Sequence, residues 1–183
     1  GKTVSLDDGG VAAILNQDGI ITGHLDITVV GSIDRQIDFA TGQTGVVRNL
    51  TINRAGTTFT VYGSGVHTCT NLTITAGTLA CDSTYGDMTV TAKAYIGDNG
   101  GASDIGTLTC NDADISIGSG ITADYGMLVV GGGTFNGGGG THTIGSIYHS
   151  NSVHAKLTLT SGVTTIDSEY TTDNYAINVL GSD

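Results

Sequence analysis

Aspartates are the residues of this chain with the clearest capacity for chemistry, and Asp112 and Asp114 form the most suggestive pair. Residues two apart on a strand project from the same face, and glycoside hydrolysis needs two carboxylates on one surface. In a turn the same side chains would only be solvated caps. The basic residue that a polysaccharide lyase needs does not join them in any motif. We therefore expect no catalytic residues, with a polysaccharide lyase or hydrolase as the alternative.

A second acidic stretch, residues 97–104, has oxygen atoms at a spacing that a calcium ion could use. Its candidate ligands are Asp98, Asn99 and Asp104. The stretch lacks the closing glutamate of an EF-hand loop and the Gly-Gly-x-Gly-x-Asp repeat of calcium-loaded β-rolls. We expect a turn stabilised by Asp and Asn side chains, without a bound ion, and we expect no cofactor.

Cysteines and histidines give little support for a metal or redox site. Cys69, Cys81 and Cys110 include no Cys-x-x-Cys pair, and we interpret them as small buried apolar side chains. A bridge between Cys69 and Cys81 stays open, because sequence alone does not place the two sulfur atoms. His149 and His154 are the only neighbouring histidines, and their spacing does not indicate a metal site.

Charge and composition exclude several classes of protein. Six Lys and Arg residues oppose 17 Asp and Glu residues, and the net charge of −11 gives a surface that repels phosphate backbones. We therefore expect no nucleic-acid partner. No apolar run is long enough for a membrane-spanning helix, so we expect no membrane insertion. The 30 glycines, the lack of proline and the preference for Asp over Glu indicate many turns between short strands.

A short triplet with apolar first and third residues recurs along most of the chain. This alternation is what a strand with one buried face requires. Successive copies begin 16 to 29 residues apart. The eight copies are Leu25-Asp26-Ile27, Leu50-Thr51-Ile52, Leu72-Thr73-Ile74, Met88-Thr89-Val90, Leu108-Thr109-Cys110, Leu128-Val129-Val130, Leu157-Thr158-Leu159 and Ile177-Asn178-Val179.

Turn residues follow the triplets. Gly56 and Gly77 come five or six residues after the start of a triplet, where a positive φ lets the chain turn a corner. After Leu108 the turn is Asn111-Asp112-Ala113-Asp114, which has no glycine. In this turn Asn or Asp can take the left-handed conformation in place of glycine. A second short strand follows several of these turns.

The repeat predicts an all-β fold, a parallel β-helix (β-solenoid) with about eight coils. Residues 1–24 are interpreted as a short N-terminal cap and residues 25–183 as the β-solenoid. Leu72, Leu108 and Leu128 should then point inward and stack on neighbouring coils. An antiparallel β-sandwich is the alternative, because its strands also recur about every 8–12 residues.

Strand–Gly–strand units such as residues 72–79 resemble those of the right-handed parallel β-helix family, also called pectate-lyase-like. The chain looks most similar to the Gly-, Thr- and Asn-rich β-helices of phage tail fibres, tailspikes and capsid decoration proteins. The resemblance covers residues 25–180. It implies a homo-trimer in a virion or an extracellular setting, with other virion or cell-surface proteins and glycans as partners.

Thr-x-Thr pairs, such as Thr73/Thr75 and Thr107/Thr109, occur at several places. Stacked on one flat face, such pairs resemble the threonine ladders of ice-binding solenoids. The uneven steps between copies speak against such a ladder, and threonine is also typical of the solvated face of any strand. We therefore interpret these threonines as ordinary surface residues.

The function we expect is that of a non-enzymatic structural or interaction protein, a phage fibre or capsid decoration module. Only four residues follow the triplet that begins at Ile177, too few for a covering helix, and a bare strand edge recruits other chains. We expect Ile177, Val179 and Leu180 to lie in an interface. The alternative is a carbohydrate-binding or polysaccharide-degrading extracellular β-helix protein.

Overall fold

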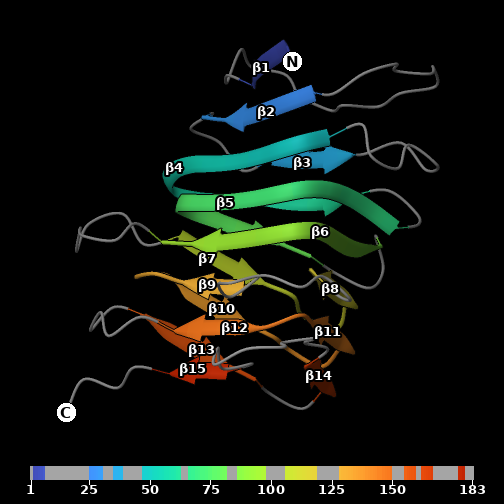
Figure 1. Ribbon diagram of the computed structural model, residues 1–183. Coiled ribbons are helices and arrows are strands. Elements are labelled where there is room, and N and C mark those ends of the chain that lie inside the picture. The colour runs from blue at the N-terminus through green and yellow to red at the C-terminus, as the bar shows by residue number, and fades with distance from the viewer. Residues whose placement is uncertain are drawn as a thin grey trace.

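The computed structural model describes residues 2–6, 25–30, 35–38, 47–62, 66–81, 86–97, 106–118, 128–149, 155–159, 162–166 and 177–179. Within these ranges the chain is all-β, has no helix, and forms one 15-stranded sheet that curls on itself (Figure 1). Every strand pair in the described part of the chain is parallel. These pairs are incompatible with the antiparallel sandwich and compatible with the predicted solenoid.

The strands differ greatly in length, from three residues to 16. Their bounds are β1 Lys2–Leu6, β2 Leu25–Val29, β3 Arg35–Asp38, β4 Val47–Tyr62, β5 Val66–Ala80, β6 Asp87–Ile96, β7 Gly106–Thr109, β8 Ile115–Ile117, β9 Leu128–Val130, β10 Thr134–Asn136, β11 His142–Ile144, β12 Ile147–His149, β13 Lys156–Thr158, β14 Thr164–Ile166 and β15 Ile177–Val179.

The strand pairs fall into three ladders, which we name A, B and C, and each strand segment in a ladder is one rung. Ladder A contains β1, β2, residues 47–52 of β4, residues 71–74 of β5, residues 93–96 of β6, β9, β12 and β15. Ladder B contains β3, residues 58–62 of β4, residues 77–80 of β5, β7, β10 and β13. Ladder C contains residues 66–69 of β5, residues 87–90 of β6, β8, β11 and β14.

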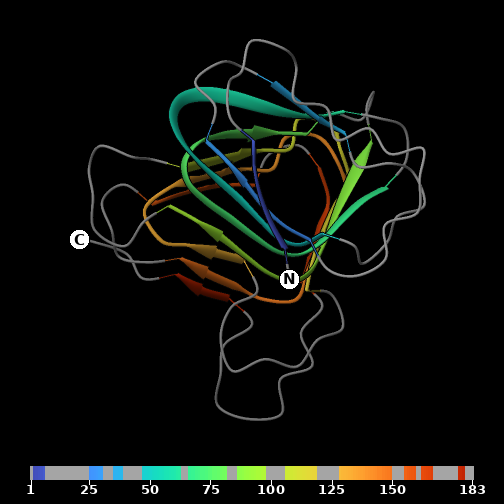
Figure 2. The ribbon, with the colours of Figure 1, turned by 90° about the horizontal axis from the view of Figure 1, so that it is seen from above.

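From residue 47 to residue 166 the chain visits the ladders in the order A, B, C and then returns to A. Each return adds one rung in register below the previous one, so the blue-to-red colours run down the stack in Figure 1. Seen from above, the strands lie over one another around a shared interior (Figure 2). The long strands β4, β5 and β6 each bend through a corner and serve more than one ladder.

The interior is apolar because alternate side chains of every ladder point into it. Strand β5 shows the alternation directly, with Leu72, Ile74 and Leu79 buried and the threonines between them only partly covered. The predicted burial of Leu72, Leu108 and Leu128 is confirmed, since each is at most 1% exposed.

The eight sequence triplets do not share one ladder, which corrects the idea that each marks one coil. Leu72 and Leu128 lie in ladder A, Leu108 lies in ladder B, and Met88 lies in ladder C. All three ladders need the same apolar–polar–apolar alternation, so the pattern alone does not tell them apart.

Turn chemistry at the corners agrees with the sequence. Gly77 has a φ of +84°, and a Cβ atom there would lie 2.2 Å from the carbonyl oxygen of Arg54. Asn111 has a φ of +49° and is the one non-glycine residue with positive φ in the described part of the chain. The prediction that Asn or Asp takes the left-handed position after Leu108 is therefore confirmed.

Part of the predicted N-terminal cap is itself a strand. Strand β1 pairs in parallel with β2 and extends ladder A by one rung. Residues 7–24 lie outside the described ranges, so the division between residues 24 and 25 stays a prediction. In the part of the chain that the structure describes, no helix is both long enough and apolar enough to cross a membrane.

Candidate interaction surfaces

The predicted calcium ligands Asp98, Asn99 and Asp104 lie outside the described residues, so the expected ion-free turn stays a prediction. In the described ranges, no group of three or more His, Cys, Asp and Glu side chains gathers where it could hold a metal ion.

Of the two carboxylates considered for catalysis, that of Asp114 accepts a backbone amide along the stack. The amide nitrogen of Asp114 donates to Oδ1 of Asp87 over 2.9 Å, and the amide of Thr141 donates to Oδ1 of Asp114 over 2.7 Å. Asp112 is exposed in the turn that follows Cys110. Asp114 therefore links successive rungs of ladder C at the entrance to its strands, which is a structural use of a carboxylate.

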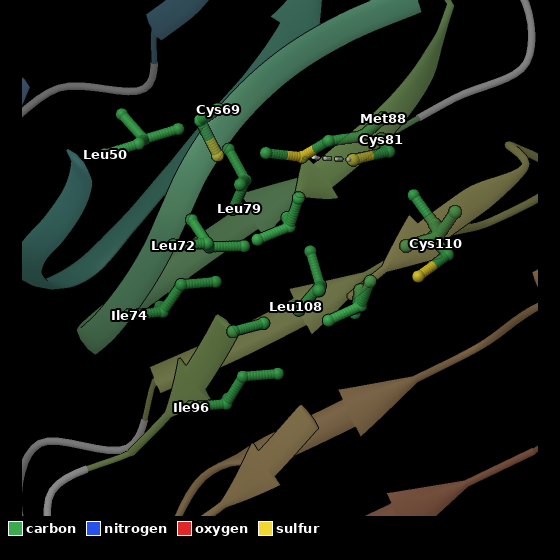
Figure 3. Close-up of a cluster of buried hydrophobic side chains, with 14 of the residues drawn as sticks. Leu50, Cys69, Leu72, Ile74, Leu79, Cys81, Met88, Ile96, Leu108 and Cys110 are labelled. Carbon is green, nitrogen blue, oxygen red and sulfur yellow. Dashed lines mark hydrogen bonds between the residues drawn. The ribbon is translucent and has the colours of Figure 1, made fainter. Parts of the chain in front are cut away.

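A group of sulfur atoms lies inside the stack (Figure 3). Cys69, Cys81 and Cys110 are buried free thiols, as the apolar interpretation predicted, and the bridge between Cys69 and Cys81 does not form. The thiol of Cys81 lies 4.0 Å from the thioether sulfur of Met88. Burial raises the pKa of Cys69 and of Cys81 to about 12 and also raises the pKa of Cys110.

Two histidines contribute to the interior of ladder C. His67 and His142 are each 1% exposed and face the same interior row, which also holds Met88 and Ile115. Nε2 of His142 lies 2.6 Å from the carbonyl oxygen of Gly137, so Nε2 carries the proton and donates it. The side chains of His149 and His154, the neighbouring pair in the sequence, lie outside the described part.

A polar network on the outer surface of ladder A was not foreseen from the sequence. Arg48 donates to both carboxylate oxygens of Asp26, from Nε over 2.9 Å and from Nη2. Asn49 donates to Oδ1 of Asp26 over 2.7 Å, and Asn71 donates to Oδ1 of Asn49 over 2.9 Å. The hydrogen bonds from Arg48 hold the pKa of Asp26 below its ordinary value. The only sequence signal was Asn-Leu-Thr-Ile, which occurs at both Asn49 and Asn71.

Ladder B carries two outward rows of small polar side chains. The residues in each row are directly opposite one another in consecutive parallel rungs, and they are at least partly exposed. The first row is Thr58, Thr78, Thr107, Thr134 and Lys156. The second row is Thr60, Ala80, Thr109, Asn136 and Thr158.

Two tyrosines share an outward row of ladder A. Tyr95 is opposite Val129 in the next rung, and Val129 is opposite Tyr148 in the rung after that. Both tyrosine side chains are half-buried. Two rungs correspond to about 10 Å along the stack. The sequence separates these tyrosines by tens of residues, so the row becomes visible only once the register is known.

Apolar side chains become exposed toward the C-terminal end of the stack. Leu108 and Phe135 in ladder B are 0% exposed, whereas Leu157, opposite Phe135 in the next rung, is only half-buried. Further along the chain, Leu159 is 44% exposed and Val163 is 64% exposed. Strand β13 pairs only with β10, and β14 pairs only with β11, in the described ranges. The edges of β13 and β14 are therefore unpaired among these residues.

Strand β15 contains two of the predicted interface residues, Ile177 and Val179. Its described pairing is with β12, which makes it the last rung of ladder A. Leu180 lies outside the described residues. Comparison of the chain with protein-family models, with curated proteins and with solved structures finds no match.

Proposed function

We propose that the chain is a structural or interaction module without enzymatic activity, built as a parallel β-solenoid of the pectate-lyase-like kind. In this proposal it serves in a virion or an extracellular setting as a phage fibre, tailspike or capsid decoration component. It assembles as a homo-trimer, and other virion or cell-surface proteins are its partners.

The observation that carries the proposal is the change in burial toward the C-terminal end. Leu79, Leu108 and Phe135 of ladder B are fully buried between rungs on both sides, whereas Leu159 and Val163 are 44% and 64% exposed. Exposed apolar residues beside unpaired strand edges are typical of surfaces that pair with another chain. An interface there would bury both the edges and these side chains.

The hydrogen bonds of Asp87 and Asp114 also favour a structural role. One oxygen of each carboxylate accepts a backbone amide of the next rung, so both carboxylates help hold the stack together. A catalytic acid or base instead has to reach the proton it transfers. The Arg48 guanidinium is likewise engaged, because it binds Asp26 on the outer surface.

Sedimentation of the purified chain tests the assembly directly. We expect an oligomer at low micromolar concentration, and we expect Val163→Asp to shift it toward monomer because a charge cannot be buried in an apolar interface. Val66→Asp is the matched control, because Val66 is also exposed, at 55%, but lies at the opposite end of ladder C. A monodisperse wild-type monomer, or equal effects of both substitutions, would contradict the proposal.

A carbohydrate-binding module is the second candidate, and the row of Tyr95 and Tyr148 favours it. Tyrosine rings offer flat apolar faces with a polar end, which suits the alternating apolar and hydroxyl surfaces of sugars. Glycan-array binding that is lost in Tyr148→Ala would support this candidate. Release of sugars from polysaccharides that stops on Asp112→Asn would instead establish an enzyme and overturn the non-enzymatic proposal.

A further inference from the structure

The two outward rows of ladder B form a grid rather than a scatter of surface threonines. Thr58, Thr78, Thr107 and Thr134 occupy the same position in four consecutive rungs, and these pairings run without a register shift from Thr78 onward. Neighbouring rungs are about 4.8 Å apart, and alternate residues of one strand are about 6.6 Å apart. Hydroxyl and methyl groups therefore repeat at fixed intervals along the first row, and in two of its four rungs a second threonine, Thr60 or Thr109, extends the pattern across the strand.

The uneven steps in the sequence do not disturb this grid. Thr107 is opposite both Thr78 and Thr134, although different numbers of residues separate it from each. The paired residues of ladder B keep one register from Thr78 to Thr134, so the difference in spacing is accommodated outside these rungs. Uneven steps in the sequence are therefore compatible with an in-register threonine ladder.

The chemistry of the grid points to an uncharged, ordered partner. Between Thr58 and Asn136 the outward positions of both rows hold only Thr, Ala and Asn, in a chain that carries 17 acidic and six basic residues. A charged partner would find no opposite charge here. An aromatic platform, as a sugar polymer would require, is also lacking from these described rows.

The side chains of the grid are suited to a rigid partner. Threonine is branched at Cβ, which restricts its χ1 angle and fixes the directions of the hydroxyl and methyl groups. The grid threonines are half-buried, so each is further held by its neighbours in the adjacent rungs. A surface with little conformational freedom loses little entropy when it meets a lattice of similar spacing.

We propose that the outward face of ladder B binds ice. Water oxygens on an ice face also repeat at regular intervals, so that hydroxyl groups of the grid can take the place of lattice waters while the methyl groups fill the spaces between them. This activity is independent of the assembly proposed above, because the grid lies on the side of the stack and the exposed apolar residues lie toward its end.

Thermal hysteresis and ice-crystal shape, measured on the full chain, test the proposal. We expect measurable hysteresis for the wild-type chain and its loss in Thr107→Lys, which places a long charged side chain in the centre of the grid. Thr143→Lys is the matched control, because Thr143 is a half-buried outward residue of ladder C with paired strands on both sides. Circular dichroism and the Tm identify any variant that fails to fold, and Thr107→Ala with Thr143→Ala then replaces the lysine pair.

Each result decides the proposal. Loss of hysteresis in the Thr107 variant together with its retention in the Thr143 variant supports it. No hysteresis in the wild-type chain overturns it, and so does equal loss in both folded variants. Co-sedimentation with crystalline cellulose or chitin without any hysteresis also overturns it, in favour of a polymer surface.

Discussion

The side-chain amide of Asn71 donates a hydrogen bond to Oδ1 of Asn49, 22 residues earlier in the chain, over 2.9 Å. Asn49 in turn donates to the carboxylate of Asp26 over 2.7 Å. The donors all point toward the N-terminal end, so the row begins with a carboxylate that only accepts. Asn71 is the last donor of the row, and Lys93 is opposite it in the next rung.

The central position of Asn49 predicts a graded response to mutation. Asn49→Ala removes two side-chain hydrogen bonds, one of them to a charged group, and should cost about 1–3 kcal/mol of unfolding free energy. Asn71→Ala removes one neutral bond and should cost about 1 kcal/mol or less. Denaturant titration of both variants checks this, and a larger loss for Asn71→Ala would contradict the direction of the row.

The ion pair of Asp26 and Arg48 predicts a dependence of stability on acid. Because hydrogen bonds from Arg48 lower the folded-state pKa of Asp26, folding favours its ionised form. This contribution is complete above the ordinary pKa of about 3.9 and disappears as the pH falls through the lower folded value. The Tm of Asp26→Asn should therefore fall less steeply below about pH 4 than that of the wild-type chain. Asp112→Asn, which changes an exposed aspartate in a turn, should keep the wild-type slope.

Truncation of Leu108 tests the packing of ladder B. Leu108 is fully buried between Leu79 and Phe135 of the adjacent rungs, so Leu108→Ala should cost about 2–5 kcal/mol. Thr107→Ala, one residue away on the outward side, should cost much less. Equal losses in equilibrium unfolding would mean that the inward and outward positions are reversed.

The buried thiols should be inert in the folded protein. Burial raises the pKa of Cys69 and of Cys81 to about 12, so almost no thiolate is present at pH 8 and reagents cannot reach the sulfur atoms. Labelling with a thiol reagent should be negligible in buffer and complete in denaturant. Rapid labelling of native protein at any of the three positions would contradict their burial.

The core of this fold could be read from the sequence, whereas most of the outer surface could not. Alternation alone identified Leu72, Leu108 and Leu128 as inward, and turn chemistry placed a left-handed Asn or Asp in the turn after Leu108, because both signals are local. Asn111 is the residue that takes this conformation. The alignment of Thr78 with Thr107, or of Tyr95 with Tyr148, depends on how many residues each connection absorbs. No local pattern encodes that number.

The contact between Arg48 and Asp26 likewise depends on a register that the local sequence pattern does not predict. Strand β4 has one extra residue relative to β2, since Leu25 is opposite Val47 and Asp26 is opposite Asn49. Arg48 is that extra residue, and a bulge of this kind redirects a side chain from its regular position. Counting residues at a constant period would have paired Arg48 with a different neighbour.

The parallel register also determines how the molecule would carry mechanical force. Backbone hydrogen bonds between rungs run along the axis of the stack. Tension between the ends of the stack therefore acts on the rungs in series, and each rung carries the same force. Strands β4, β5 and β6 span 16, 15 and 10 residues and turn corners, whereas β8 through β15 span three residues each. A rung joined by fewer bonds opens under a smaller load. Under tension the stack should therefore unzip from its C-terminal half, while the segment from Val47 to Ile96 stays closed.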